Sequence, residues 1–434
     1  MFTAARYIAI DDDRAELGAL IDALHAIGAP CIGIQFDPPK LPDESLFSGL
    51  RILLTDLHLL NAAASPNQHY DNIAAILNKC IPDKHGPFLV VLWTSHEHER
   101  AAFSARLNEI LPAEKKPLAV LALDKNKFQE AEGWNGSALQ NAIRAKIAEM
   151  PQLSALLSWE RDVLAASNAT LSLIGDLVPA NDRTAGKYPG ALDRVLSLLA
   201  EAAAGQTSAK ANPRSAVSAA LAPLLADRIL NQSDDKVASE LWAHAVTFPA
   251  DAKDLTDIQK ARMHRMLHFA LPPAERVAST DWGAVTPLGE AQLADDEMLK
   301  RFGITGTQLR QTEFKVKADR INDGHLVLVR VGAECDQAQG KAGPIPTLLG
   351  LLIAKDALGK DSRSAAVLRC PEEILLEGAD VPLALLVHAR FATSMVAADF
   401  QHWPKPLFRI REQLLMTILV HSATHLMRPG TLRF

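Results

Sequence analysis

The sequence predicts an α/β protein that begins with a doubly wound parallel sheet over residues 1–150. An all-α segment over 151–279 and an α+β domain over 280–434 follow it. Three observations support this division. The first 150 residues alternate short apolar runs with longer amphipathic stretches, residues after Pro151 are rich in Ala and Leu at helical spacing, and the last third returns to β-rich runs with turns. A chain of 434 residues also exceeds the ~250–300 residues of a single core.

Five strand-sized apolar runs and intervening helical segments make up the first domain. The segment 15–27 places Leu17, Leu20, Ile21, Leu24 and Ile27 on one helical face. Strands alternating with helices predict a parallel sheet that is covered on both faces. The expected strands are 7–10, 31–36, 51–54, 88–93 and 118–123, and the other expected helices are 72–79, 98–110 and 136–149.

The remaining residues are predicted to form helices and then a mixed domain. Helical spacing runs through 153–275, with an exposed polar loop at 204–215 (AGQTSAKANPRS). The final region carries β-rich stretches at 314–316, 326–331, 366–368 and 383–387, a turn at Asn322-Asp323-Gly324, and a long helical pattern from Leu407 to Leu426. A small β-barrel with a terminal helix is one form that such an α+β domain could take.

Composition excludes several classes of protein. With 48% hydrophobic and 22% charged residues, the chain has enough apolar side chains to bury a sizeable core. The net charge is −6 and the basic residues are scattered, which argues against nucleic-acid binding. No apolar run reaches the ~20 residues of a membrane span, and no signal peptide is recognisable at the N-terminus. Four widely spaced cysteines predict reduced thiols, so we expect a cytoplasmic protein.

Chemically distinct side chains follow four of the five predicted strands. Asp11, Asp12 and Asp13 end the first strand, Asp56 the third, Thr94 the fourth, and Lys125 follows the fifth. Binding sites of open parallel sheets form at the carboxyl ends of the strands, so these groups are expected to converge. A carboxylate that attacks a phosphoryl donor needs a divalent cation to screen the repulsion, and Mg²⁺ prefers such hard oxygen ligands.

These residues resemble the receiver domains of two-component response regulators, over about residues 1–150. The resemblance implies a flavodoxin-like sheet of strand order 2-1-3-4-5. It implies that Asp56 is the phosphoacceptor, that Asp11, Asp12 and Asp56 bind Mg²⁺, and that Thr94 and Lys125 contact the phosphoryl group. A histidine kinase would be the upstream partner. No nucleic-acid-binding helix or enzyme motif is evident in the later domains, so a protein partner is expected downstream; the sequence does not indicate an oligomeric state.

The chain departs from the family pattern in several places. Asn126 stands where receivers usually have a proline directly after the lysine. Lys127 is therefore an alternative to Lys125, and Ala122 or a neighbour stands where the family has a larger switch residue on the fifth strand. The segments around Ala62–Tyr70 and Pro112–Lys116 are longer than usual. These departures bear more on conventional switching than on phosphorylation.

Other interpretations stay open. In one alternative, Asp11, Asp12, Asp13 and Thr94-Ser95 serve merely as helix caps. In another, the domain is a pseudo-receiver scaffold that needs no phosphorylation. A phosphate-accepting buffer in a relay, including one of a bacterial defence system, is a further possibility that rests on analogy. A weaker alternative is an enzyme with its site at Cys335, Asp336 and Lys341. The pairs His264/His268 and His421/His425 share helical faces but lack a third metal ligand, and a relay role for His244 or His264 has no supporting neighbours.

Overall fold

The computed structural model describes residues 5–37, 40–60, 64–83, 85–131, 133–231, 236–249, 255–333, 336–337, 343–359 and 364–427. The chain divides into two compact units. The first comprises residues 1–165 with 232–247, and the second comprises 166–231 with 248–434. The boundaries at 150 and 279 stay predictions. No helix within the described ranges combines the length and apolar character needed to cross a membrane.

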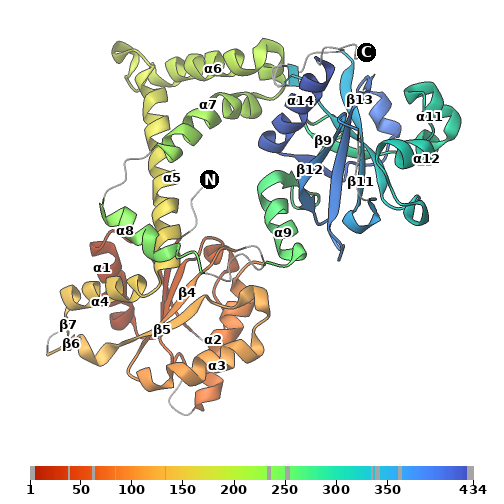
Figure 1. Ribbon diagram of the computed structural model, residues 1–434. Helices are drawn as coiled ribbons and strands as arrows, with labels where there is room; N and C mark the ends of the chain where they lie inside the picture. Colours follow the sequence, from red (N-terminus) through yellow and green to blue (C-terminus); the bar gives the residue numbers. More distant parts are fainter. Residues whose placement is uncertain are drawn as a thin grey trace. The chain divides into compact units, whose positions relative to one another are not determined.

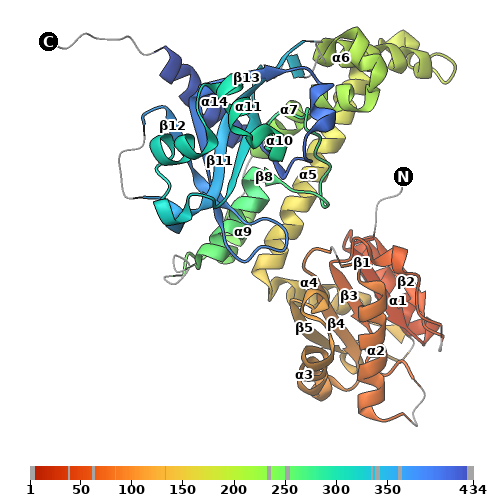
Figure 2. The same ribbon diagram turned by 90° about the vertical axis from the view of Figure 1, so that its right-hand side faces the viewer.

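The first unit contains a five-stranded parallel sheet in the order β2-β1-β3-β4-β5. Figure 2 shows this order across the sheet. The predicted strand order is therefore confirmed. All five predicted strands are present, and each predicted end lies within one residue of the observed end. Their bounds are β1 (Tyr7–Asp11), β2 (Cys31–Gln35), β3 (Ile52–Thr55), β4 (Leu89–Thr94) and β5 (Ala119–Asp124).

Helices cover both faces of this sheet, as Figure 1 shows. Helices α1 (Arg14–Ala26) and α4 (Gly136–Ala148) pack on one face, and α2 (Pro66–Cys80) and α3 (Arg100–Ile110) on the other. β3 and β4 are buried along their whole length because apolar side chains on both of their faces meet helices. A two-stranded hairpin of β6 (Gln129–Glu130) and β7 (Gly133–Trp134) precedes α4.

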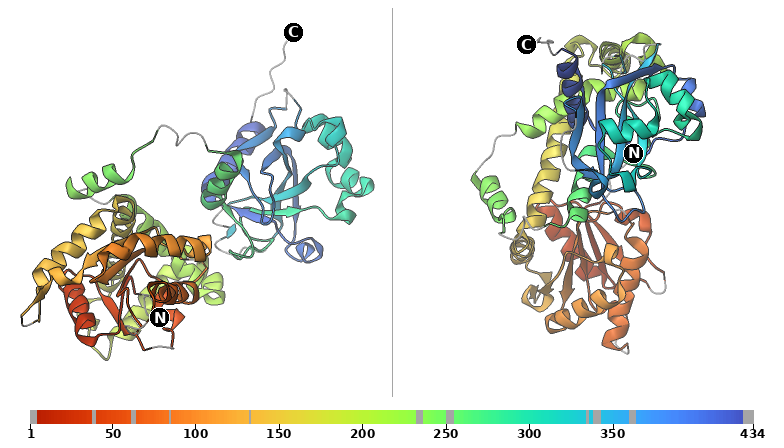
Figure 3. Two further views of the ribbon diagram at one scale, coloured as in Figure 1. Left: turned by 90° about the horizontal axis from the view of Figure 1, so that it is seen from below. Right: turned by 45° about the vertical axis from the view of Figure 1, so that its right-hand side comes forward.

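The predicted helical segment is present. Helix α5 (Pro151–Asp176), yellow in Figure 3, leads to α6 (Tyr188–Ala211), α7 (Pro213–Leu230), α8 (Lys236–Ala245) and α9 (Asp257–His268). The loop expected at 204–215 is wrong in extent, because within it the chain leaves helical conformation only at Gly205 and at Asn212. Gly205 has φ 72° and ψ 155°, which are not helical, so α6 consists of two helical stretches joined at a kink, and small alanines pack α6 against α7. The second break comes at Asn212, whose side chain caps α7.

The second unit contains a seven-stranded antiparallel sheet that curves toward a nearly closed barrel. Its order is β12-β13-β11-β10-β9-β14-β8. Helix α9 precedes the edge strand β8 directly and also packs on β12, the strand at the opposite edge. The strands are β8 (Phe269–Ala270), β9 (Ala284–Pro287), β10 (His325–Arg330), β11 (Ile345–Ala354), β12 (Val367–Ile374), β13 (Leu383–Met395) and β14 (Phe408–Ile410).

Alternate residues of this sheet face two different cores. Val327 and Val329 of β10 pack with α14 (Glu412–Leu426), whereas Leu326 and Leu328 pack on the side of α11 (Asp295–Phe302). Short helices α10 (Glu290–Leu293) and α12 (Gly306–Gln308) flank α11. The helix expected from Leu407 instead begins at Glu412, because residues 408–410 pair with β9 and β8. Of the strand expected at 314–316, only an isolated bridge at Val316 forms.

Candidate functional site

The parallel sheet brings the predicted site residues to one edge. Asp11 ends β1, Asp56 directly follows β3, Thr94 ends β4, and Lys125 directly follows β5. The backbone N–H of Asp56 donates to the carbonyl oxygen of Ile10 at 3.0 Å, so the ladder between β1 and β3 sets Asp56 beside Asp11. The side chains predicted to lie at the carboxyl ends of the parallel strands are therefore found at that edge of the sheet.

Asp11, Asp12 and Asp56 form a carboxylate cluster. One oxygen from each lies within 4.8 Å of the others. Asp11 is fully buried and Asp56 is 6% exposed, whereas Asp12 is open to solvent. Asp11 Oδ1 accepts the backbone N–H of Asp13 at 2.8 Å, but Oδ2 is buried without a hydrogen-bond partner. A buried carboxylate oxygen without a donor is costly in a closed core, and it fits a position that a cation would complete.

Electrostatics at the cluster point the same way. Burial raises the pKa of Asp11 to about 7, and the charges of Asp56 and Glu16 add to the rise. Burial and the Asp56 charge also raise the pKa of Asp12. Like charges in a poorly solvated site repel one another, so the cluster has a surplus of negative charge that a divalent cation would offset. The oxygen-only donor set suits a hard cation of the Mg²⁺ or Ca²⁺ type.

Lys125 reaches this cluster, but it has a second partner. Its Nζ lies 3.4 Å from Asp56 Oδ2 and 2.6 Å from Glu16 Oε2. Burial alone would lower the pKa of Lys125, but Asp56 and Glu16 outweigh burial and raise it. Sequence reasoning missed Glu16. Glu16 lies three residues after the helix cap Asp13, which is typical of a capping box. The sequence pattern therefore suggested a capping role for Glu16 and not a position beside Lys125.

A short turn replaces the missing proline after Lys125. Residues 125–127 form a 3₁₀ turn, and Asp124 Oδ1 accepts the backbone N–H of Asn126 at 3.1 Å. Proline has no N–H, so this cap requires a residue such as Asn126. Lys127 Nζ lies instead near Glu97 and Asp124, at 3.4 and 3.7 Å. Lys125 is therefore the lysine that contacts Asp56 in this structure.

Thr94 and Asp13 make local backbone contacts. Thr94 is fully buried, and its Oγ1 accepts the backbone N–H of His96 at 3.1 Å. Asp13 caps α1 through bonds from the N–H groups of Ala15 and Glu16. The helix-capping interpretation thus describes Asp13, whereas Asp11 and Asp12 make no such contact with α1 among the described residues. Ala122 is buried in the core between the sheet, α2 and α3.

Among the residues that the structure describes, the other side chains singled out in the sequence do not converge on a metal-binding cluster. Cys335 and Lys341 lie outside the described residues, so only Asp336 of that trio is placed. His264 Nδ1 accepts the backbone N–H of Glu373 at 3.2 Å, which ties α9 to β12. Among the described residues, three or more metal-binding side chains converge at two places, and neither includes His264, His268, His421 or His425.

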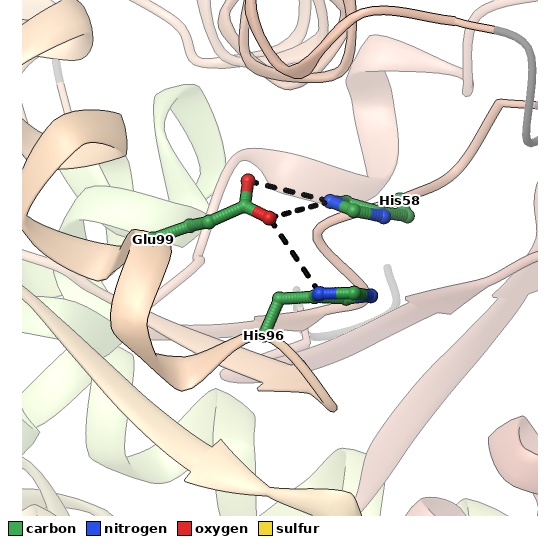
Figure 4. A group of neighbouring side chains, drawn as sticks. All are labelled: His58, His96 and Glu99. Carbon is green, nitrogen blue, oxygen red and sulfur yellow. Dashed lines mark hydrogen bonds and ion pairs between the residues drawn. The ribbon is translucent and has the colours of Figure 1, made fainter.

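The second of these places was not anticipated. His58, His96 and Glu99 lie together near the same sheet edge, as Figure 4 shows. His58 follows Asp56 by two residues, and His96 follows Thr94 by two. This shared offset is present in the sequence. It indicates that His58 and His96 lie close together only when β3 and β4 are known to be neighbours.

Comparison with protein-family models found no match for the chain, and comparison with curated proteins found none either.

Proposed function

We propose that the first unit accepts a phosphoryl group on Asp56, as receiver domains of two-component systems do. One observation carries the proposal: three carboxylates and an ammonium group converge at the carboxyl edge of a 2-1-3-4-5 parallel sheet. The proposed roles follow the chemistry of each group. Asp56 is the nucleophile, Asp11, Asp12 and Asp56 hold Mg²⁺, and Lys125 pairs with the phosphoryl oxygens.

The transfer requires an in-line attack. A carboxylate oxygen of Asp56 forms the new P–O bond while the bond from phosphorus to the donor breaks and the donor takes the electron pair. The donor is the phosphohistidine of a partner kinase or a small acyl phosphate. Mg²⁺, when bound, offsets the negative charge of the donor and the three carboxylates. Lys125 lies where it contributes a second positive charge within 3.4 Å of Asp56.

Signalling would follow from the new charge. A phosphoryl group on Asp56 adds strong acceptor oxygens and a charge of about −1.5 to −2. The hydroxyl of Thr94, now an acceptor in a local turn, would rotate to donate to a phosphoryl oxygen and release the N–H of His96. Such a change alters the segment after β4, and we propose that a protein partner in the cytoplasm reads it.

Phosphorylation by acetyl phosphate tests this proposal. We expect the full chain, incubated with acetyl phosphate and Mg²⁺, to gain the mass of one phosphoryl group. Asp56→Asn should abolish the gain, and Asp12→Asn should reduce it severalfold because Mg²⁺ binding is weakened. Asp13→Asn is the matched control, since asparagine caps a helix as well as aspartate does and Asp13 lies outside the cluster. No gain in the folded protein with Mg²⁺ present would contradict the proposal.

A scaffold that uses the receiver fold without phosphorylation is the second candidate. The observation that favours it is the ion pair of Lys125 with Glu16, which at 2.6 Å is shorter than the contact with Asp56. An ammonium group held by another carboxylate is less free to bind a phosphoryl group. This candidate predicts that Asp56→Asn binds the downstream partner as the wild type does. Phosphoacceptance predicts that partner binding responds to acetyl phosphate in the wild type and no longer does so in Asp56→Asn.

A further inference from the structure

We propose that His58, His96 and Glu99 form a binding site for a divalent transition-metal ion of the Zn²⁺ type, separate from the carboxylate cluster. The three residues come from two loops that follow adjacent strands. His58 lies after β3, and His96 and Glu99 lie after β4, with Glu99 at the start of α3. Their side chains point toward one another in Figure 4.

The distances between the candidate ligand atoms match a metal polyhedron. His58 Nε2 lies 3.3 and 3.4 Å from the two oxygens of Glu99, and His96 Nδ1 lies 3.6 Å from Glu99 Oε1. Charge-assisted hydrogen bonds are shorter, at roughly 2.7–2.9 Å. Ligands at about 2.0–2.1 Å from a tetrahedral Zn²⁺ are separated by about 3.3–3.4 Å. The three groups are therefore spaced more like ligands of a common ion than like partners in a tight ion pair.

Glu99 is held in place by a further residue. The hydroxyl of Tyr70 on α2 donates to Glu99 Oε2 at 2.7 Å, and the Glu99 side chain is only 14% exposed. Residues that hydrogen-bond a metal ligand fix its orientation and raise metal affinity. The carboxylate is thus held in one orientation, with its oxygens toward both histidines.

The histidines of the site pack against one another. The His58 ring stacks on His96 at 4.2 Å and on His69 at 4.3 Å between ring centroids. His69 is buried, and its Nδ1 has no hydrogen-bond partner. The stack thus holds the His58 ring with its Nε2 toward Glu99.

The donor set selects a different ion from the carboxylate cluster. Two imidazole nitrogens and one carboxylate suit Zn²⁺ and its neighbours in the first transition series, whereas Mg²⁺ prefers oxygen ligands alone. His96 is 44% exposed, so the site is open on one side, where water or a substrate atom could complete the coordination. A bound ion would join the segment after β3 to the segment after β4.

Metal titration in the presence of Mg²⁺ tests the site. With the carboxylate cluster saturated by Mg²⁺, we expect the full chain to bind one Co²⁺, visible in the d–d absorption, and Zn²⁺ to displace it. His58→Gln and His96→Gln should each weaken binding by more than about tenfold. The controls are His25→Gln, an exposed histidine on α1, and Asp56→Asn, and both should bind Co²⁺ like the wild type.

Three results would overturn the proposal. One is no Co²⁺ binding to the folded wild type, and another is binding that survives both histidine substitutions. The third is binding that is lost in Asp56→Asn, because the ion would then occupy the carboxylate cluster. If a histidine variant loses its native circular dichroism spectrum, Glu99→Gln replaces it, since the amide oxygen still accepts from Tyr70. The readout is independent of phosphorylation, so this inference and the proposed function can fail separately.

Discussion

At the scale of single residues, Asp11 shows how the site is built at the expense of stability. It is fully buried, one of its oxygens has no hydrogen-bond partner, and its pKa is raised to about 7. A group that is expensive to bury and lies beside two further acids is typical of a functional position rather than a structural one. Neighbouring Asp13 has the opposite role, because both of its side-chain contacts stabilise α1.

Asp11 makes the stability of the metal-free protein depend on pH. Its pKa in the folded protein, about 7, is above the ordinary value of 3.8, so the folded state binds more protons between these values. The free energy of unfolding of the first unit should therefore fall as pH rises from about 4 to about 7, and this contribution should be constant above pH 7. Chemical denaturation in metal-free buffer between pH 5 and 8 measures the effect.

The variant Asp11→Asn isolates this contribution. It should flatten the fall with pH and be more stable than the wild type at pH 8, by about 1–3 kcal/mol, because an uncompensated buried charge is gone. It should also lose the stabilisation by Mg²⁺. Asp22→Asn, an exposed acid on α1, serves as the control and should follow the wild type. Equal pH dependence in Asp11→Asn and wild type would contradict the assignment.

At the scale of elements, the first turn of α1 and the turn after β5 together position Lys125. Asp124 caps the turn through the N–H of Asn126, and Glu16 of α1 holds the ammonium group at 2.6 Å. The capped turn thus positions Lys125 beside Asp56 without the proline that usually follows this lysine in receivers. The helix contributes a carboxylate that competes with Asp56 for Lys125. Local sequence explains the turn, whereas the contact with α1 depends on how the helix packs on the sheet.

Removal of this competitor should favour phosphorylation. In Glu16→Gln the lysine keeps Asp56 as its charged partner, and the site carries one negative charge less toward the dianionic donor. We expect acetyl phosphate with Mg²⁺ to phosphorylate this variant severalfold faster than the wild type. Glu149→Gln removes the partner of Lys146 elsewhere in the first unit and should leave the rate unchanged. An equal or slower rate in Glu16→Gln would show that Glu16 supports the site instead.

At the scale of the whole molecule, each compact unit has its own buried core. The parallel sheet of the first unit has apolar clusters on both faces, and the seven-stranded sheet of the second unit has two more. Units with separate cores are able to unfold as separate cooperative transitions. The carboxylate cluster belongs entirely to the first unit.

Calorimetry with and without Mg²⁺ should therefore show an effect on one transition alone. At a concentration a hundred times the Kd, a ligand that binds only the folded state stabilises it by about 2.7 kcal/mol. We expect the transition of the first unit to move to higher temperature and the other to stay in place. Asp12→Asn should abolish most of the shift. A shift of both transitions in that variant would indicate that Mg²⁺ acts elsewhere.

The features that sequence predicted well are those with a local physical cause. Apolar runs of strand length, alternating with amphipathic segments, indicate β1 to β5 and their helices because burial on a sheet or helix face imposes a period on neighbouring residues. The acids and Lys125 could be assigned to one edge because every parallel strand ends there. The helix 407–426 was overestimated at its start because apolar residues 408–410 suit a buried strand equally well.

The sequence alone therefore determined the parallel sheet, its strand order by resemblance, and the edge where Asp11, Asp12, Asp56, Thr94 and Lys125 meet. Only the tertiary structure decided that Glu16 shares Lys125, that His58, His96 and Glu99 converge, and that seven antiparallel strands curve toward a barrel. The reason is the same in each case. These contacts join residues far apart in the chain, and pairing or packing between distant segments leaves no periodic signal in the residues on either side.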